Sequence, residues 1–258
     1  MDFKAEYKRL RDQHPNAPAQ FEEVITGVYT SVLQPNDISV DCGAHTGKHT
    51  LPMARCIGPG GRVFAFEPIA EKLAVLESKA KSAELSEVIT ARNCVVGDKR
   101  GPISFNFVQA DPGKSSLRLR QDLRSDAKKM ETNLVRQLEM VRLDDCIPEN
   151  GRCRFIKVDV EGAELLVLKG AERTIVHHRP IVHVELGMIC LKEFGASPEE
   201  LWAFFSDKNY TLVDVVGNVL ETESEFLASE AASGLYDYFA VPHDIETDLI
   251  ERAASRVF

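Results

Sequence analysis

A repeated alternation of short apolar runs with helical patterns constrains this chain more than any other feature. Between the runs, apolar residues recur at the three- and four-residue spacing of a helix face, for example from Gln20 to Leu33 and from Thr46 to Cys56. Strands that alternate with helices predict a parallel sheet with helices on both faces and right-handed crossovers. The runs that we predict as strands are Ile38–Cys42, Arg62–Phe66, Val88–Val95, Phe155–Val160 and Ile181–Leu186.

The alternation breaks in the middle of the chain and again near its end. Ile103–Val108 has the pattern of an antiparallel strand. The polar segment 110–137 is long for a connecting loop and predicts a lid-like insertion, before a short strand at Leu138–Leu143. Tyr210–Val216 and Tyr236–Val241 complete the predicted strands, and the direct strand-to-strand turn after the first of them predicts an antiparallel end to the sheet.

Length and composition indicate one soluble domain over residues 1–258. We expect an N-terminal helical segment at 1–35, a core at 36–190 and a C-terminal helix with antiparallel strands at 191–258. The chain is 44% hydrophobic and 28% charged, and no apolar stretch reaches the length of a membrane span. Its first residues are charged and lack the apolar core of a signal peptide, so we expect a cytoplasmic protein.

The net charge of −9 argues against nucleic acid as the main partner, because binding to phosphates requires clustered Lys and Arg. A small molecule is therefore the expected partner. The sequence does not predict an oligomeric state.

The first motif is the glycine loop Asp41-Cys42-Gly43-Ala44-His45-Thr46-Gly47, between a predicted strand and a predicted helix. Its two glycines allow a sharp turn and a close approach to a ligand. A dinucleotide fingerprint would need a third glycine, and an acid before the loop suits a pyrophosphate poorly. An acid with a helix N-terminus instead matches the amino and carboxylate groups of an amino-acid moiety. The alternative is a strand-to-helix turn that binds nothing.

Glu67 follows the second predicted strand, where a carboxylate can accept hydrogen bonds from both hydroxyls of a ribose. Pro68 suits the first position of the next helix and holds the acid at the strand tip. Asn93, near the end of the third strand, is placed either to bond an adenine edge or to stabilise a turn.

A second acidic motif, Asp159-Val160-Glu161-Gly162, ends a buried strand. Buried carboxylates are costly unless they are paired, so Asp159 and Glu161 are expected to face a cleft, with Lys157 as a possible buried partner. On the next strand His183 and Glu185 project from the same face and are candidates to complete the site. His183 is equally well interpreted as a hydrogen-bonded core histidine.

Several of these segments together resemble the FkbM family of S-adenosylmethionine-dependent methyltransferases, over about residues 36–190. The most specific match is IKVDVEGAELLVLKGA, from Ile156 to Ala171. The supporting segments are the glycine loop, the Phe66-Glu67-Pro68 tripeptide, the Asn93 region and Ser115-Ser116-Leu117.

The resemblance implies the class I methyltransferase fold, a Rossmann-like three-layer α/β sandwich around a seven-stranded, mostly parallel sheet whose last strand is antiparallel. It also implies S-adenosylmethionine as cofactor and a small-molecule hydroxyl, as on a sugar or natural product, as acceptor. By the same resemblance, the residues that would bind the cofactor are Asp41, Gly43, Ala44, His45, Gly47, Glu67, Pro68, Asn93, Val95 and Asp159. His45 stands where the family often has Asn.

The catalytic candidates are Asp159, Glu161, His183 and Glu185. Our hypotheses are that Glu161 or His183 takes the proton of the acceptor, or that a metal such as Mg²⁺, held by Asp159 and Glu185, acidifies it. Acids that only form hydrogen bonds are the alternative to a metal site. For the chain as a whole, the alternatives are a non-catalytic module that binds S-adenosylmethionine and a nicotinamide-dependent oxidoreductase, although the motifs of a hydride-transfer site are missing.

Overall fold

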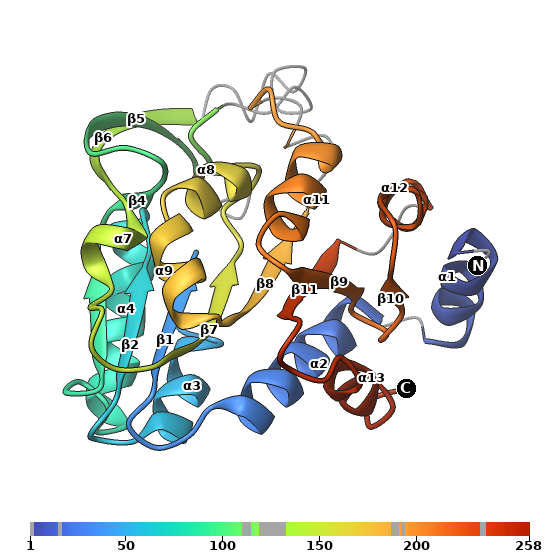
Figure 1. Cartoon of the computed structure of the whole chain (residues 1–258). Helices are drawn as coiled ribbons and strands as arrows, with labels where there is room; N and C mark the ends of the chain where they lie inside the picture. Colours follow the sequence, from blue (N-terminus) through green and yellow to red (C-terminus); the bar gives the residue numbers. More distant parts are fainter. Residues whose placement is uncertain are drawn as a thin grey trace.

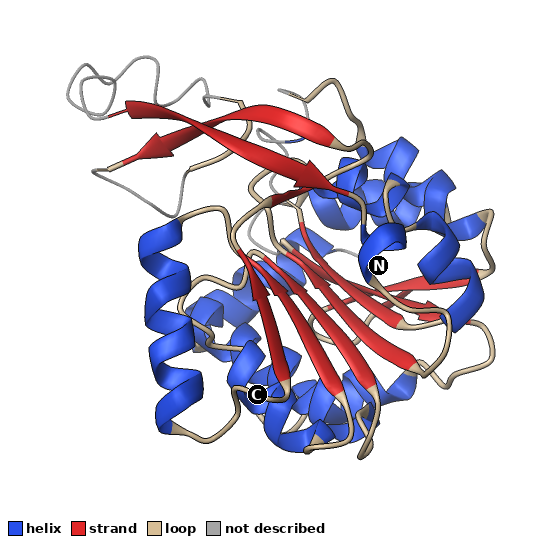
Figure 2. Cartoon of the chain, turned by 90° about the vertical axis from the view of Figure 1, so that its left-hand side faces the viewer, coloured by secondary structure: helices blue, strands red, loops and turns tan. Residues whose placement is uncertain are grey.

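The computed structural model describes residues 3–14, 17–109, 115–118, 133–186, 191, 194–232 and 236–258. Within these residues, a large sheet runs through the centre of the molecule and a smaller sheet lies beyond one of its ends (Figures 1 and 2). The strands of the large sheet are β1 (Ile38–Cys42), β2 (Arg62–Phe66), β3 (Ile89–Arg92), β7 (Cys153–Val158), β8 (Ile181–Glu185), β9 (Tyr210–Asp214), β10 (Val219–Leu220) and β11 (Asp237–Pro242).

The large sheet has the strand order β10-β9-β11-β8-β7-β1-β2-β3. The neighbours from β3 to β8 are parallel, whereas β11 is antiparallel to both β8 and β9. The predicted α/β class and the antiparallel strand near the end of the chain are therefore confirmed. Among the described residues the sheet has eight strands rather than seven, because the turn after β9 brings back the two-residue edge strand β10.

Helices cover both faces of this sheet (Figure 1). The chain steps outward from β1 in one direction to β3, and from β7 in the other direction to β8. Right-handed crossovers then place the helices of the two halves on opposite faces, and ligands bind at such a reversal. The helices are α1 (Phe3–Gln13), α2 (Ala17–Val32), α3 (Thr50–Ile57), α4 (Ala70–Ser82), α7 (Leu143–Cys146), α8 (Glu164–Lys169), α9 (Glu172–His178), α11 (Pro198–Ser206), α12 (Glu223–Ala231) and α13 (Asp248–Ala254).

The smaller sheet consists of β4 (Val95–Val96), β5 (Gly101–Val108) and β6 (Asn133–Val141) in the order β4-β6-β5. β5 and β6 pair antiparallel as a long ribbon, which crosses above the large sheet in Figure 2. A small apolar cluster, which includes Phe105 and Met140, lies under the ribbon. This sheet therefore forms a wall beyond the carboxyl ends of the central strands.

Three predicted elements differ from the structure. The run Val88–Val95 splits into β3 and β4, which belong to different sheets. The strand predicted at Leu138–Leu143 begins at Asn133, so the end of the 110–137 segment is strand β6. Residues 110–114 and 119–132 of the predicted insertion lie outside the described residues.

The helix after the glycine loop begins at Thr50 rather than at Thr46 or Gly47. The reason is the backbone of the loop, where His45 and Gly47 have φ of 49° and 83°. Right-handed helices require negative φ, so the chain turns for several more residues before α3 begins. The loop is accordingly longer than its sequence pattern indicates.

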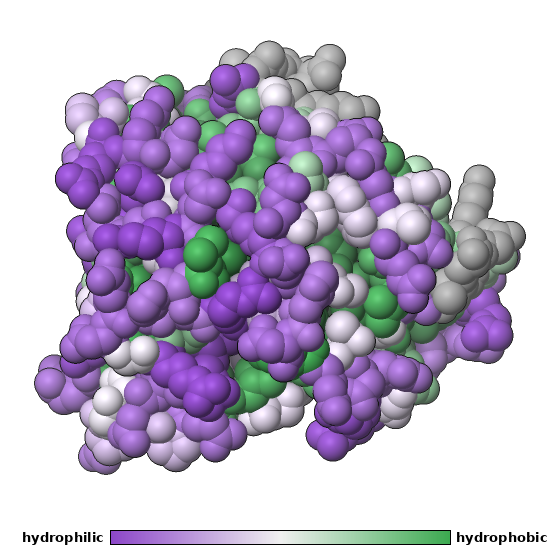
Figure 3. All heavy atoms as spheres, viewed as in Figure 1, coloured by the Kyte–Doolittle hydropathy of each residue, from purple (hydrophilic) through white to green (hydrophobic). Residues whose placement is uncertain are grey.

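No helix among the described residues is long and apolar enough to cross a membrane. The face seen in Figure 1 is mostly hydrophilic, with apolar side chains in small separate patches (Figure 3).

Candidate functional site

A pocket of about 250 Å³ lies beyond the carboxyl ends of β1, β2 and β7. This is where the strand order reverses direction, the usual ligand site of open α/β sheets. The predicted site residues in its wall are Asp41, Gly43, Ala44, His45, Glu67, Pro68, Val95, Asp159 and Glu161. Gly47, Asn93, His183 and Glu185 are not part of that wall. The structure thus brings together both acidic motifs and the acid after β2.

Gly43 lets the two acidic motifs approach each other closely. Its φ is 84°, and a Cβ at this position would lie 1.8 Å from the backbone oxygen of Asp159. The N–H of Asp159 in turn donates to the backbone oxygen of Cys42 at 3.1 Å. A side chain at position 43 would force the loops after β1 and β7 apart.

Asp41 is buried at the end of β1 and offers one carboxylate oxygen that no protein group satisfies. Its Oδ2 accepts a hydrogen bond from the Thr50 hydroxyl at 2.6 Å, whereas its Oδ1 has no hydrogen-bond partner among the described residues. An unpaired buried carboxylate oxygen is costly. Because Asp41 lines the pocket, a ligand with a cationic amino group would satisfy this oxygen.

Glu67 is 4% exposed and is fixed by the backbone around it. The N–H of His45 donates to Oε2 at 2.7 Å and the N–H of Ile69 donates to Oε1 at 2.8 Å. Burial raises the pKa of Glu67 to about 7, against the lowering effect of these two bonds. Two carboxylate oxygens have about four acceptor sites, so hydroxyl groups of a ligand can still bind.

Asn93 serves the turn after β2 and does not line the pocket. Its amide nitrogen donates to the backbone oxygens of Glu67 and Pro68, both at 2.9 Å. Cys94, Val95 and Val96, which follow it, belong to the pocket wall. Of the two interpretations of Asn93, the structure agrees with the turn residue.

Asp159 is paired with Lys157 at the end of β7. The Lys157 ammonium lies 2.8 Å from Oδ2 of Asp159, and the lysine is almost fully buried. Burial alone would raise the pKa of Asp159, but the charge of Lys157 outweighs it and lowers that pKa. Asp159 is therefore a carboxylate with a fixed position. Lys157 is the buried partner that the sequence suggested.

His183 is a buried core histidine outside the pocket. Its Nε2 lies 2.9 Å from Oδ1 of Asp237 on β11, and its Nδ1 has no partner among the described residues. Burial lowers the pKa of His183 although Asp237 acts against this. Glu185, two residues later, is close to Asp159 but does not line the pocket. Burial and the neighbouring charge of Asp159 raise the pKa of Glu185 well above its usual range.

These acids do not fit a metal site. Among the described residues no group of three or more His, Cys, Asp or Glu side chains is arranged to hold a metal ion. Asp159 is already bound to the Lys157 ammonium. We therefore assign no Mg²⁺ to Asp159 and Glu185.

The opposite wall of the pocket is apolar, with contributions from both sheets. Phe66, Ile69, Val95 and Phe105 line it. Such a surface suits the flat ring of a nucleobase.

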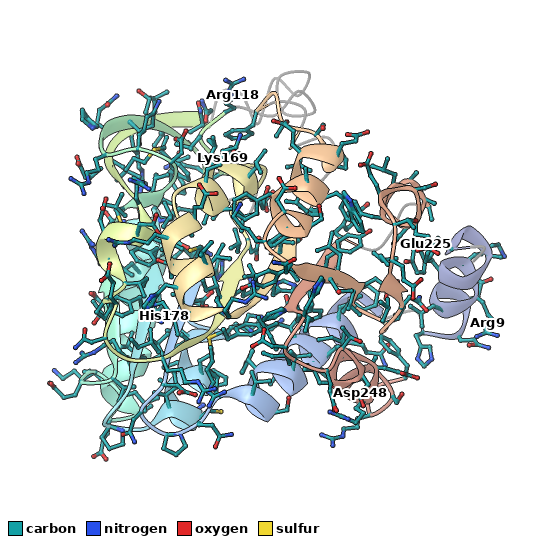
Figure 4. All side chains as sticks on the ribbon, viewed as in Figure 1. Arg9, Arg118, Lys169, His178, Glu225 and Asp248 are labelled. Atoms are coloured by element: carbon teal, nitrogen blue, oxygen red, sulfur yellow. The ribbon has the colours of Figure 1, made fainter. Side chains whose placement is uncertain are left out.

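A short segment at 115–118 reaches the same pocket. Ser115 and Leu117 line it, and Ser116 forms an isolated bridge with Asn106 of β5. Arg118 projects near the end of β5 in Figure 4, and its guanidinium lies 5.5 Å from the ring centre of Phe194. Two residues of the predicted insertion, Ser115 and Leu117, therefore line the site.

The pocket also contains a charged cluster that the sequence did not reveal. Glu22 of α2 forms an ion pair with the His49 ring and lies 3.3 Å from the Lys48 ammonium. Burial alone would raise the pKa of Glu22, but His49 outweighs it and lowers that pKa to about 2. Glu22 is an isolated acid on a helix, so no local pattern distinguishes it from a surface residue. Only tertiary packing places it beside the end of the glycine loop.

The chain matches known proteins over most of its described core. Residues 41–212 match the model of the methyltransferase FkbM domain. Methyltransferase 1 of Beauveria bassiana (strain ARSEF 2860) is 30% identical over 52% of this chain, and methyltransferase sdnD of Sordaria araneosa is 30% identical over 54%. These matches span 57% and 62% of the length of the two curated relatives.

One similar solved structure is a methyltransferase FkbM from Methylobacillus flagellatus KT. It is 19% identical, with a TM-score of 0.47 over 82% of this chain and 49% of that one.

Proposed function

The chain belongs to the methyltransferase FkbM domain family, and from that premise we propose that it transfers the methyl group of S-adenosylmethionine to a hydroxyl of a small molecule, such as a sugar or natural product. The observation that carries the proposal is the unpartnered, buried Oδ1 of Asp41 in a pocket that Glu67 also lines. An amino group and a ribose at these two positions are features of this cofactor.

Different residues of the pocket bind different parts of the cofactor. Asp41 accepts from its amino group, Glu67 from the ribose hydroxyls, and the apolar wall with Phe66 and Val95 covers the adenine. The glycine loop, through Gly43, allows the backbone to come close to the methionine part. When bound, the cofactor supplies an electrophilic methyl group, so the protein has to align the acceptor and remove one proton.

Glu161 is the candidate for the group that takes this proton. It lines the pocket two residues after Asp159, and its φ is 57°, a backbone conformation that non-glycine residues rarely adopt. Such strain is frequent at functional sites, where it fixes the direction of a side chain. His183 is a weaker candidate, because it points at Asp237 and does not reach the pocket. Asp159 positions the ligand and does not take the proton, because the Lys157 ammonium keeps its carboxylate ionised and bound.

Further parts of the proposal rest on the sequence. The net charge of −9 favours a small acceptor over a nucleic acid. We also propose a cytoplasmic location. The acceptor would enter the pocket past segment 115–118 and Phe194. Met188, which we also expect to border this entrance, lies outside the described residues.

The test is turnover with S-adenosylmethionine labelled in its methyl group. Sugars and polyketide-like alcohols serve as acceptors, with amine and thiol analogues of the same compounds as controls. We expect the label in an O-methyl product and equimolar S-adenosylhomocysteine. Labelled N-methyl or S-methyl product without O-methyl product would contradict the choice of acceptor atom. Tight binding of the cofactor without transfer to any acceptor would favour the non-catalytic binding module.

A further inference from the structure

The charged cluster of Glu22, Lys48 and His49 at one end of the pocket is not used by the function proposed above. All three residues line the pocket, although Glu22 comes from α2 and the other two from the end of the glycine loop. His49 is 5% exposed, whereas the side chain of Lys48 is 63% exposed. The cluster thus combines a buried histidine with a lysine that faces the pocket and solvent.

The hydrogen bonds around His49 occupy both of its ring nitrogens. Nε2 pairs with the Glu22 carboxylate, and Nδ1 lies 3.4 Å from the Tyr29 hydroxyl. That hydroxyl also donates to the Thr26 hydroxyl at 3.1 Å. Both ring nitrogens of His49 are therefore occupied by protein partners.

Lys48 differs from Lys157 and His49, two other basic residues that line the pocket. Lys157 is buried and bonded to Asp159 at 2.8 Å, and both ring nitrogens of His49 have protein partners. The Lys48 ammonium has three donors, and its one ion pair among the described residues is the 3.3 Å contact with Glu22. Glu22 contacts His49 through its other carboxylate oxygen. It thereby holds the Lys48 side chain at the pocket and does not occupy all three donors of the Lys48 ammonium.

The position of Lys48 relative to Asp41 indicates what it binds. Thr50, two residues after Lys48, donates to Asp41 Oδ2 at 2.6 Å. This bond holds the start of α3 next to the Asp41 carboxylate, which in our proposal binds the amino group of the ligand. In an amino-acid moiety the carboxylate is attached to the same carbon as the amino group. A ligand whose amino group satisfies Asp41 Oδ1 therefore has its carboxylate within reach of this end of the loop.

We propose that Lys48, supported by the Glu22–His49 ion pair, binds the carboxylate of the methionine part of the cofactor and so selects ligands that carry this carboxylate. This inference rests on the proposed function, because it assumes that the pocket binds S-adenosylmethionine. A charge-assisted bond of this kind strengthens binding by roughly tenfold or more. The α2 helix then belongs to the cofactor site, although it precedes the region that matches the family model.

The experiment compares S-adenosylmethionine with decarboxylated S-adenosylmethionine, which keeps the amino group, sulfonium and nucleoside. Calorimetry measures the dissociation constants of both ligands for the wild type, Lys48→Gln and Lys72→Gln. Lys72 is a matched control, because it is a lysine of α4 close enough to lower the pKa of His45 but does not line the pocket. Thermal unfolding confirms that each variant is folded.

We expect Lys48→Gln to weaken S-adenosylmethionine about tenfold and to leave the decarboxylated ligand within about twofold, with no such difference for Lys72→Gln. Equal weakening of both ligands, or no weakening of either, overturns the assignment of Lys48. If the folded wild type binds neither ligand, the proposed function itself fails. This outcome is distinct from failure of the Lys48 assignment, because it is seen in the wild type and does not depend on the variants.

Discussion

The buried Lys157 ammonium and the partly buried Asp159 carboxylate form an ion pair, 2.8 Å apart, at the end of β7. Asp41 is the register partner of Lys157 on the neighbouring strand β1, so one buried cation lies between the two acidic motifs. Because neighbouring residues in register project from the same face of a sheet, Lys157 also limits the repulsion between the two acids. The two motifs can therefore face one pocket in spite of their like charge.

Replacing Lys157 by Met should destabilise the protein strongly. The change leaves the Asp159 carboxylate, whose side chain is 29% exposed, without its partner, so the cost should lie below the roughly 3–5 kcal/mol of a fully buried pair. Urea unfolding of the variant measures this loss. Lys8→Met is the control, because it breaks the exposed Lys8–Asp12 pair and should change stability by less than about 1 kcal/mol. Similar small losses for both variants would show that the Lys157–Asp159 pair does not stabilise the loops.

Gly43→Ala should be more destabilising than Gly58→Ala. Both glycines have positive φ, of 84° and 69°, so alanine is strained by about 1–3 kcal/mol at either position. Only at Gly43 would the new Cβ also meet backbone, the oxygen of Asp159, whereas nothing lies within 4 Å at Gly58. Chemical unfolding should thus show a larger loss for Gly43→Ala, and equal losses would contradict the close approach of the two loops.

Glu67 should make the stability of the protein depend on pH. Its pKa in the folded state is about 7, above its usual value of about 4.5, so the folded state holds this proton more tightly. The stabilisation is complete below about pH 4.5 and is lost as pH rises through about 7. From pH 5 to 8 the wild type should lose stability relative to Glu67→Gln, by an amount on the order of 2 kcal/mol. Parallel stability curves would show that the carboxyl is not shifted.

The sequence predicted the parts of the fold that depend on local pattern. The strands β1, β2, β7 and β8 correspond to the apolar runs that we predicted as strands. Patterns of this kind depend on residues a few positions apart, so one chain segment is enough to reveal them.

Features that depend on tertiary packing were not predicted. The division of 88–95 between two sheets and the late start of α3 follow from long-range pairing and from positive φ values. Glu22 and His49 are 27 positions apart, and neither has a distinctive neighbourhood in the sequence. His183 and Glu185 share one face of β8 because side chains alternate along a strand, but this alternation does not show how far a side chain lies from a pocket.

Glu161 and His183 should respond differently to substitution. Glu161→Gln removes the proposed base, so single-turnover methyl transfer should fall by roughly a hundredfold or more, with cofactor affinity unchanged. His183→Asn breaks the bond to Asp237 and should lower the free energy of unfolding by about 1–3 kcal/mol, while the folded enzyme keeps its turnover. The reverse outcome would make His183 the base.

Chelation should not affect methyl transfer. Asp159 is bound to the Lys157 ammonium, and the described residues contain no group of three or more His, Cys, Asp or Glu side chains arranged to hold a metal ion. Turnover measured after dialysis against EDTA should therefore equal turnover in the presence of added Mg²⁺. A loss that Mg²⁺ restores would reinstate the metal hypothesis.

The pocket at the ends of β1, β2 and β7 is the centre of this account, and titration calorimetry with S-adenosylhomocysteine and with NAD tests it most directly. The account predicts that the wild type binds one equivalent of S-adenosylhomocysteine and no NAD. It also predicts that Asp41→Asn, which removes the charge facing the amino group, weakens binding by about tenfold. Binding of NAD, or no binding of S-adenosylhomocysteine by the folded wild type, would contradict it.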